Sequence, residues 1–318
     1  MLFACNKGIV KYGNEIFGKE ENMDTQASKW SKDWTPAEVK GVSSGKILYE
    51  KKHLFNGGIA RLRFNNEIRP GLHALSGDMI REFRLILGDS NYDPSIGVIL
   101  LDSVGDKSFF AGGDVRWEAE GGLAEMYETG MADAQASMRR CRKPIIAVVK
   151  GYCIASGNHM SYFADFTIAG ENAIFGQTGP MIGSPADGYL VSYLTRVVGA
   201  KKAREMWMLC RRYNAKEALD MGLVNVVVPL DKLDEEVEKW CVEILEKSPT
   251  CIQIVKTAFD SDIDYMRGNV GLTQVLAGPE FHTGTEAGEA QQAFFEKRRP
   301  NWWKFRNMPS PEERGVEN

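Results

Sequence analysis

Residues 143–176 read KPIIAVVKGYCIASGNHMSYFADFTIAGENAIFG, and the pattern that decides the fold lies in this stretch. An apolar run of strand length, 144–149, leads into a loop of small residues and then into a short helical pattern, 159–164. Two further apolar runs, 166–169 and 173–175, come next. Strands that are buried on both faces read as continuous apolar runs. The stretch therefore predicts buried strands connected through a helix.

The same alternation of strands and helices extends toward the N-terminus. Residues 58–64 alternate with period two, and 96–101 form another apolar run of strand length. Helices are predicted over 76–87, with Ser76 as the N-cap, and over 123–141. Strands that alternate with helices imply right-handed crossovers and a mainly parallel sheet. We therefore predict an α/β fold.

The pattern divides the chain into three regions. Residues 1–45 are polar, and we interpret them as an N-terminal extension that runs over the surface. The core is expected to span 46–229. Residues 230–318 are mostly helical, with apolar residues at three- and four-residue spacing, followed by an irregular tail. Helical regions of this kind often pack on a neighbouring subunit, so we expect an oligomerisation region.

Composition excludes several classes of protein. The 318-residue chain has 43% hydrophobic and 26% charged residues, ordinary values for a soluble globular protein. A net charge of −4 gives no general attraction to nucleic acid or to an anionic membrane. Its 4 histidines and 6 cysteines lack zinc-ligand spacing, so no metal is predicted. We see no signal peptide and no apolar run of the roughly 18 residues that a membrane span needs, and we expect a cytoplasmic protein with reduced thiols.

Two glycine-rich loops carry the candidate chemistry. The first, 108–114, follows the 96–101 strand and contains Gly112 and Gly113. The second, 151–159, follows the 144–149 strand and opens a helix. Glycines in such loops can simply serve tight turns or close packing. However, loops that follow successive parallel strands open at the same sheet edge, and the N–H groups at a helix N-terminus suit a developing oxyanion.

The two loops together resemble the oxyanion hole of the crotonase (enoyl-CoA hydratase/isomerase) superfamily. The resemblance extends over about 46–305 and is most specific in a few long strings. They are FGQTGP at 175–180, KKAREMW at 201–207, ALDMGLV at 218–224 and FFEKRRP at 294–300. These strings are similar to the subgroup of 1,4-dihydroxy-2-naphthoyl-CoA synthase and 2-ketocyclohexanecarboxyl-CoA hydrolase.

This resemblance implies a spiral ββα core, a C-terminal helical trimerisation region, and a homotrimer or a homohexamer built as a dimer of trimers. It implies that the substrate is an acyl-CoA and that the backbone N–H groups of Gly113 and Ser156 bind the thioester oxygen. Ser156 stands where glycine is usual, which a backbone donor tolerates if its φ is negative. Phe294 and Lys297 are then expected to contact coenzyme A, and no tightly bound cofactor is expected.

The range of possible reactions is limited by the residues that this chain has where related enzymes carry their catalytic acids and bases. Simple enoyl-CoA hydratases resembling this chain use two glutamates, and the matching residues here are His159 and Gly179. Ordinary alkene hydration is therefore disfavoured. Gln177 and Thr178 fit the naphthoate synthases that use bound bicarbonate as a base, and Tyr189 replaces an aromatic residue of that site.

Other positions depart from the naphthoate synthases. Those enzymes place an aspartate where this chain has Ala186, and a tyrosine where a gapless match puts His282. The subgroup makes or breaks carbon–carbon bonds between a thioester α-carbon and a carbonyl. We therefore predict a hydrolase that opens a cyclic 2-oxo-acyl-CoA. The alternatives are a 1,4-dihydroxy-2-naphthoyl-CoA synthase, an unusual hydratase-like enzyme, or a crotonase-fold scaffold without catalysis.

A ring-opening hydrolase needs a base for water and an acid for carbon. Asp187 and His159 are the candidates, with His282 as a third polar group. Each also has a plain structural interpretation, as a helix N-cap, a capping or packing ring, or a surface residue. Ala111 in the first loop and Tyr127 in the segment that follows it are expected to contact the substrate, although a core tyrosine is an equal alternative for Tyr127.

Overall fold

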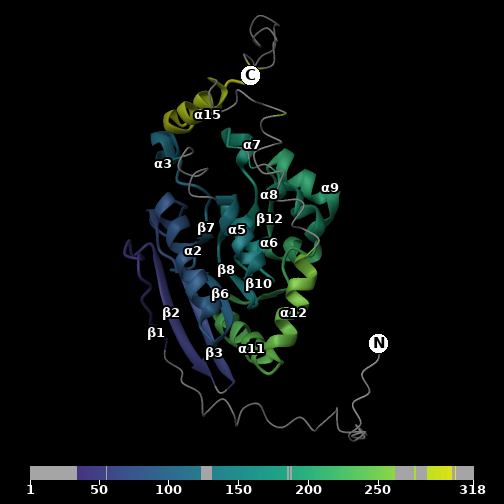
Figure 1. Cartoon of the computed structure of the whole chain (residues 1–318). Coiled ribbons are helices and arrows are strands. Elements are labelled where there is room, and N and C mark those ends of the chain that lie inside the picture. Colours follow the sequence, from purple (N-terminus) through teal and green to yellow (C-terminus); the bar gives the residue numbers. More distant parts are fainter. Residues whose placement is uncertain are drawn as a thin grey trace, which may run out of the picture.

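The computed structural model describes residues 34–54, 56–122, 131–184, 186, 188–261, 276, 285–302 and 305. A large sheet runs through the middle of this part of the chain and helices flank it (Figure 1). The predicted α/β fold is confirmed.

The central sheet has seven strands, in the spatial order β1 (Thr35–Pro36), β2 (Ile47–Leu54), β3 (Gly57–Phe64), β6 (Ile96–Ser103), β8 (Ile145–Val149), β10 (Phe166–Gly170) and β13 (Val226–Val228). The five strands from β3 to β13 are parallel to one another. The pairs β1–β2 and β2–β3 are antiparallel. The prediction of a mainly parallel sheet therefore holds.

A smaller sheet has the order β12 (Arg212–Asn214), β11 (Ile174–Gly176), β9 (Tyr152–Ile154) and β7 (Ser108–Phe110). The sequence interpretation treated 108–110 and 152–154 as loop, and this is wrong. Both are three-residue strands, which are too short to show a hydrophobic period. They exist because β7 and β9 pair in parallel with each other. A two-stranded hairpin, β4 (Glu67–Arg69) and β5 (Leu72–His73), precedes them.

The helices follow the predicted order with shifted ends. Their bounds are α2 Gly77–Tyr92, α3 Val115–Trp117, η2 Glu118–Gly122, α5 Met131–Arg140, α6 Ser156–Phe163, α7 Gly179–Ile182, α8 Tyr189–Ser192, α9 Leu194–Leu209, α10 Ala215–Asp220, η3 Leu230–Lys232, α11 Leu233–Leu245, α12 Pro249–Asp260 and α15 Thr285–Glu296. Ser76 occupies the N-cap of α2, but its side chain forms no capping hydrogen bond. Its hydroxyl accepts instead from Lys46 Nζ at 3.2 Å.

The central strands divide their side chains between two cores, because successive residues of a strand point to opposite faces. In β6, Ile99 and Leu101 belong to the core beneath α2, α5 and α6, whereas Val98 and Leu100 belong to the core beneath α11. In β8, Ile146 and Val148 also face the α11 side. The continuous apolar runs in the sequence are therefore strands with both faces buried.

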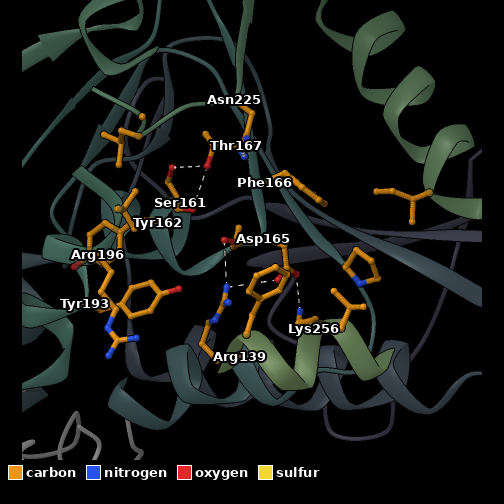
Figure 2. A pocket seen from close by; sticks show the side chains of 18 of the residues that line it. Arg139, Ser161, Tyr162, Asp165, Phe166, Thr167, Tyr193, Arg196, Asn225 and Lys256 are labelled. Atoms are coloured by element: carbon orange, nitrogen blue, oxygen red, sulfur yellow. Dashed lines mark hydrogen bonds and ion pairs between the residues drawn. The ribbon is translucent and has the colours of Figure 1, made fainter. Parts of the chain in front are cut away.

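A network of buried charges attaches α12 to the sheet and to α5 (Figure 2). Asp165, just before β10, accepts from Lys256 Nζ at 2.5 Å and lies 3.5 Å from the guanidinium of Arg139. Arg139 also pairs with Asp260. Asp165 accepts the Ile145 N–H at 2.8 Å as well. Because both cations and both anions are largely buried, each depends on its partners for compensation.

We predict that Asp165→Ala lowers the free energy of unfolding by about 3–5 kcal/mol, because it leaves two buried cations without a common partner. Asp220→Ala is the matched control, since Asp220 pairs with Lys216 on the surface, where both side chains are mostly exposed. The control should lose no more than about 1 kcal/mol. Urea unfolding followed by circular dichroism measures both, and equal losses would contradict the prediction.

Candidate active site

Two loops meet at the end of the smaller sheet because β7 and β9 are parallel neighbours. Residues 111–114 leave β7, and Ala155 connects β9 to α6. Their approach is close. A Cβ atom added to Gly157 would overlap the carbonyl oxygen of Phe110, and one added to Gly112 would lie 3.2 Å from Ala155 Cβ. The structure thus brings together the two loops that the sequence singles out.

The backbone N–H of Gly113 is free of protein partners in the described part of the chain. Leu75 donates to Gly112 O at 2.9 Å, and Asp114 donates to Leu75 O at 2.9 Å. These two bonds form a parallel bridge between Leu75 and Gly113. In such a bridge the flanking peptide groups bond to Leu75, so the N–H of Gly113 points away from that strand.

The backbone N–H of Ser156 is also available. Ser156 is the first residue of α6, and the first N–H groups of a helix have no intrahelical acceptor. No described residue accepts from it. The preceding residue, Ala155, takes the unusual conformation φ 52°, ψ −115°, whereas Ser156 keeps a negative φ. This is the condition under which serine can replace glycine as a backbone donor.

The side chain of Ser156 faces a different environment from its N–H. Ser156 and Gln135 both line a cavity of about 10 Å³ among apolar residues. Ser156 Oγ and Gln135 Oε1 are buried without a partner in the described residues. A cavity of this size holds about one water molecule. The hydroxyl of Ser156 therefore points into the protein interior. The group that is available to a ligand is its backbone N–H.

His159 lies one turn further along α6 and is 5% exposed. Its ring centroid is 5.5 Å from that of Trp207 and 5.6 Å from that of Tyr162. Burial lowers the pKa of His159 to about 3, and the nearby Gln177 side chain acts in the opposite direction. His159 is therefore neutral at pH 7, where it can donate one hydrogen bond and accept one.

Several buried polar groups around His159 have no hydrogen-bond partner in the described residues. They are both ring nitrogens of His159, both amide atoms of Gln177 and Nε1 of Trp207. A buried polar atom without a partner costs about 1–3 kcal/mol. Thr178 and Gly179 follow Gln177, and a Cβ on Gly179 would lie 3.5 Å from the Trp207 ring. We call His159, Gln177 and Trp207 the polar cluster, and it is chemically suited to a small polar ligand.

Two other predicted contacts lie nearby. Ala111 is half-buried, and its N–H donates to His73 O at 2.8 Å, so this N–H is not available to a substrate. Tyr189 is 1% exposed and packs edge-on against Phe163, with ring centroids 4.8 Å apart. Both stay predicted substrate contacts.

The predicted coenzyme A contacts lie on α15 and just after it. That helix contacts α7, which begins at Gly179, and lies at the same end of the molecule as α3 (Figure 1). The ring of Phe294 is 42% exposed. Lys297 is exposed and has a φ of 55°, a left-handed conformation that ends the helix. Both side chains are accessible, and their contact with coenzyme A stays a prediction.

Three predicted residues, Tyr127, Asp187 and His282, lie outside the described residues. Their roles therefore remain predictions. Ala186, between them in sequence, is half-buried and packs against the main core.

Glu118 is a candidate that the sequence interpretation missed. It opens η2, and its carboxyl oxygen Oε1 occupies the space that a Cβ atom on Gly113 would need. Burial, helped by the nearby charge of Asp114, raises the pKa of Glu118 to about 7. In the sequence its only sign is a carboxylate five residues after Gly113, within the run GDVRWEAE at 113–120.

A cavity of about 630 Å³ lies elsewhere in the described part of the chain (Figure 2). It is lined by the C-terminal half of α6, by α12 and by Arg139, Asp165 and Lys256, and by none of the predicted site residues. The charges of those three residues are already paired with one another. We therefore do not place the chemistry there.

Within the described part of the chain, no group of three or more His, Cys, Asp or Glu side chains is placed to hold a metal ion. None of the helices in the described residues combines the length and apolar content needed to cross a bilayer.

Comparison with known proteins gives a consistent result. Residues 55–305 match the profile of the enoyl-CoA hydratase/isomerase family. A methylmalonyl-CoA decarboxylase in complex with 2-nitronate-propionyl-CoA is similar in structure, with a TM-score of 0.70 and 26% identity over 80% of this chain and 97% of that one. An enoyl-CoA hydratase from Bacillus anthracis has a TM-score of 0.60 and 27% identity, over 76% of this chain and 94% of that one.

A third similar structure, an enoyl-CoA hydratase/carnithine racemase from Magnetospirillum magneticum, has a TM-score of 0.63 and 24% identity. It covers 86% of this chain and 98% of the other. At this identity the likeness concerns the fold alone.

We predict that Gly157→Ala lowers stability, because the new methyl group would overlap the Phe110 carbonyl and push the two loops apart. Gly88→Ala makes the same chemical change inside α2, where no atom lies within 4 Å. That control should be stabilised by about 0.5–1 kcal/mol. Thermal unfolding compares the two, and a Gly157 variant as stable as the wild type would show that the loops can separate freely.

Glu118 also predicts a pH effect on stability. Between its ordinary pKa of 4.5 and its folded pKa of about 7, the unfolded chain releases a proton that the folded chain keeps. Stability contributed by this group therefore falls as pH rises through this window. Glu118→Gln should gain thermal stability over the wild type at pH 8 but little at pH 4. The exposed Glu120→Gln should show no such trend, and a gain that is equal at both pH values would contradict the prediction.

Proposed function

Because the chain belongs to the enoyl-CoA hydratase/isomerase family, and so to the acyl-CoA-processing enzymes of the crotonase superfamily, we propose that it opens the ring of a cyclic 2-oxo-acyl-CoA by hydrolysis. Within that superfamily, its motifs resemble those of the subgroup of 1,4-dihydroxy-2-naphthoyl-CoA synthase and 2-ketocyclohexanecarboxyl-CoA hydrolase, and this resemblance supports the proposal. The observation that carries the proposal is that two contacting loops each hold a backbone N–H without a described partner, while a buried, uncharged polar cluster begins at His159, one turn further along α6.

The free N–H groups of Gly113 and Ser156 suit a thioester whose oxygen gains charge during the reaction. Preorganised donors of this kind stabilise an enolate, and the loss of one costs about 3–4 kcal/mol in comparable sites. Both lie on contacting loops held by the β7–β9 pairing, so their relative position is fixed before a ligand binds.

The polar cluster disfavours simple alkene hydration. Hydration in related enzymes relies on two glutamates, and here those positions carry His159 and Gly179. Since His159 is neutral at pH 7, it is a poor source of an acidic proton. A neutral imidazole can instead hydrogen-bond a ring ketone or the attacking water, which suits a substrate with an oxo group.

The proposed reaction balances without an added oxidant or cofactor. Water adds to the ring ketone, which lies β to the thioester, and loses one proton to a base. The adduct collapses to a carboxylic acid as the bond to the α-carbon breaks, and the electron pair passes to the thioester enolate. A proton then returns to the α-carbon, leaving a linear dicarboxylic mono-CoA ester. Asp187 and His282 are further candidates to assist the water and the ring oxygen.

A second candidate, 1,4-dihydroxy-2-naphthoyl-CoA synthase, is favoured by one observation. The N–H groups of Gln177 and Trp207 are buried without a described partner, and an anion such as bicarbonate would satisfy them. The donor set therefore fits bicarbonate, which would supply a base to the site. The aspartate that this synthase uses is replaced by Ala186, so we place this function second.

The proposal also covers the binding of the coenzyme A portion of the substrate and the oligomeric state of the protein. Phe294 and Lys297 are proposed to contact the coenzyme A portion, since both are exposed beside α7. The helical region after 229 is proposed to build a homotrimer or a dimer of trimers, as the family likeness suggests.

We predict that 2-oxocyclohexanecarbonyl-CoA is converted to a linear product heavier by one water, as measured by mass spectrometry. Ser156→Ala should keep activity within a few-fold, since it removes the hydroxyl and retains the N–H. Gly157→Ala should lose at least about 100-fold, the scale of one oxyanion donor. Turnover of o-succinylbenzoyl-CoA, with no turnover of any cyclic oxoacyl-CoA, would instead establish the synthase.

A further inference from the structure

We infer that Glu118 is a catalytic acid–base residue of this site, which takes a proton from the attacking water and delivers it to the α-carbon of the thioester. The inference rests on the proposed function for the identity of the substrate. Its basis in the structure is the position of the carboxyl group beside the oxyanion loop.

Contact with Gly113 places this carboxyl at the reacting end of the site. Its oxygen Oε1 touches the Cα face of Gly113, and its carboxyl carbon lies 3.0 Å from the point where a Cβ atom would stand. The N–H of the same residue is one of the two free donors. When the thioester oxygen of the substrate binds at that N–H, the α-carbon of the substrate, which is bonded to the thioester carbonyl carbon, lies close to the Glu118 carboxyl.

Glycine at 113 is what leaves room for this arrangement. Any side chain at that position would displace the carboxyl, because a Cβ atom would overlap Oε1. Glu118 is held there by a short turn: Asp114 caps α3 by accepting from Arg116 N at 3.0 Å, and Glu118 N donates to Asp114 O at 2.9 Å. The turn then continues as the π-helix η2. Such π-turns are rare and occur often at functional sites.

The Glu118 carboxyl has no structural task within the described part of the chain. No described side chain or backbone group forms a hydrogen bond or ion pair with it. Among the described residues, the charged group that contributes to its ionisation is Asp114, which is also an acid and whose carboxylate accepts from Arg116 N. A partly buried carboxyl without a neighbouring cation would lower the stability of the fold if its role were purely structural.

Its ionisation suits the transfer of protons near neutral pH. Burial and the charge of Asp114 raise the pKa of Glu118 to about 7, so both forms are populated at pH 7. A general acid or base works best when its pKa is close to the working pH. His159, whose pKa is lowered to about 3, does not meet this condition, so the two groups divide the work.

The step balances around this one residue. The Glu118 carboxylate accepts a proton from water as the water oxygen bonds to the ring ketone. The adduct then breaks its bond to the α-carbon and forms the carboxylic acid and the thioester enolate. The protonated Glu118 gives its proton to the α-carbon and returns to the carboxylate. His159 and the two backbone donors remain uncharged throughout and act by hydrogen bonding.

The test measures exchange of the α-protons of pimeloyl-CoA, the expected ring-opened product, with D₂O. Removal of an α-proton is the reverse of the proposed last step, and it requires no ring opening. In the wild type the exchange rate should rise with pH through about 7, as the carboxylate forms. Glu118→Gln should lower that rate by at least about 100-fold and abolish its pH dependence.

Matched variants separate catalysis from folding. Glu120→Gln, an exposed neighbour in η2, should keep the wild-type rate and pH profile. Glu118→Asp retains a carboxyl group on a shorter side chain, so its exchange rate should be reduced but should keep the pH dependence. This variant replaces Glu118→Gln in the test if Glu118→Gln does not fold. Pimeloyl-CoA should bind Glu118→Gln within about threefold of the wild type, because both backbone donors remain.

The outcomes for this residue and for the proposed function are distinct. Exchange that depends on Glu118, without ring opening of any cyclic substrate, supports the residue and overturns the hydrolase. Ring opening that Glu118→Gln leaves within threefold of the wild type overturns the residue and keeps the hydrolase. A wild-type protein that exchanges no α-proton also counts against Glu118.

Discussion

The pairing of β7 with β9 is the constraint on which the site depends. It joins two loops that come from distant parts of the chain, and it does so through glycines that let backbone touch backbone. At Gly157 a Cβ atom would overlap the Phe110 carbonyl, and at Gly151, with φ 57°, it would overlap Lys107 O. Tyr152 N donates to that same Lys107 oxygen at 3.0 Å. These contacts fix the backbone of the two loops that carry Gly113 and Ser156, the proposed oxyanion donors.

Two kinds of buried polar group serve opposite purposes along α6. At its C-terminal end, Arg139 donates to Phe163 O at 2.9 Å and is paired with carboxylates, so it both stabilises the helix end and is fully compensated. At the N-terminal end the groups are uncharged and unpaired, as in the polar cluster. Each unpaired group costs folding free energy that the large apolar core must offset. The arrangement is explained most simply if a ligand completes those hydrogen bonds.

The main features of the fold follow from the sequence because they depend on long apolar runs. Ile99 and Val148 lie in continuous apolar runs, which are typical of strands buried on both faces. The parallel sheet follows from the alternation of these runs with helices. The short strands β7 and β9 could not be predicted, since three residues carry no period and their existence depends on a partner 40 or so residues away in the chain. The approach of the two loops was predicted because glycine-rich turns and a family likeness mark them, whereas the role of Ser156 stays a prediction. Glu118 was missed because its importance comes only from its contact with Gly113, and the capping role of Ser76 was lost to Lys46.

The same reasoning explains why charge is placed where it is. The proposed enolate at the N-terminus of α6 would be stabilised by peptide dipoles and neutral donors, whose ionisation does not change during a reaction. A permanent cation beside the thioester would bind the charged state strongly and would also lower the pKa of any neighbouring carboxyl. Arg139 and Lys256 are instead held at the far end of the helix by Asp165 and Asp260. Burial and the charge of Asp114 raise the pKa of Glu118 to about 7, and no described cation opposes this shift, so the distant ion network is consistent with the acid–base role proposed for Glu118.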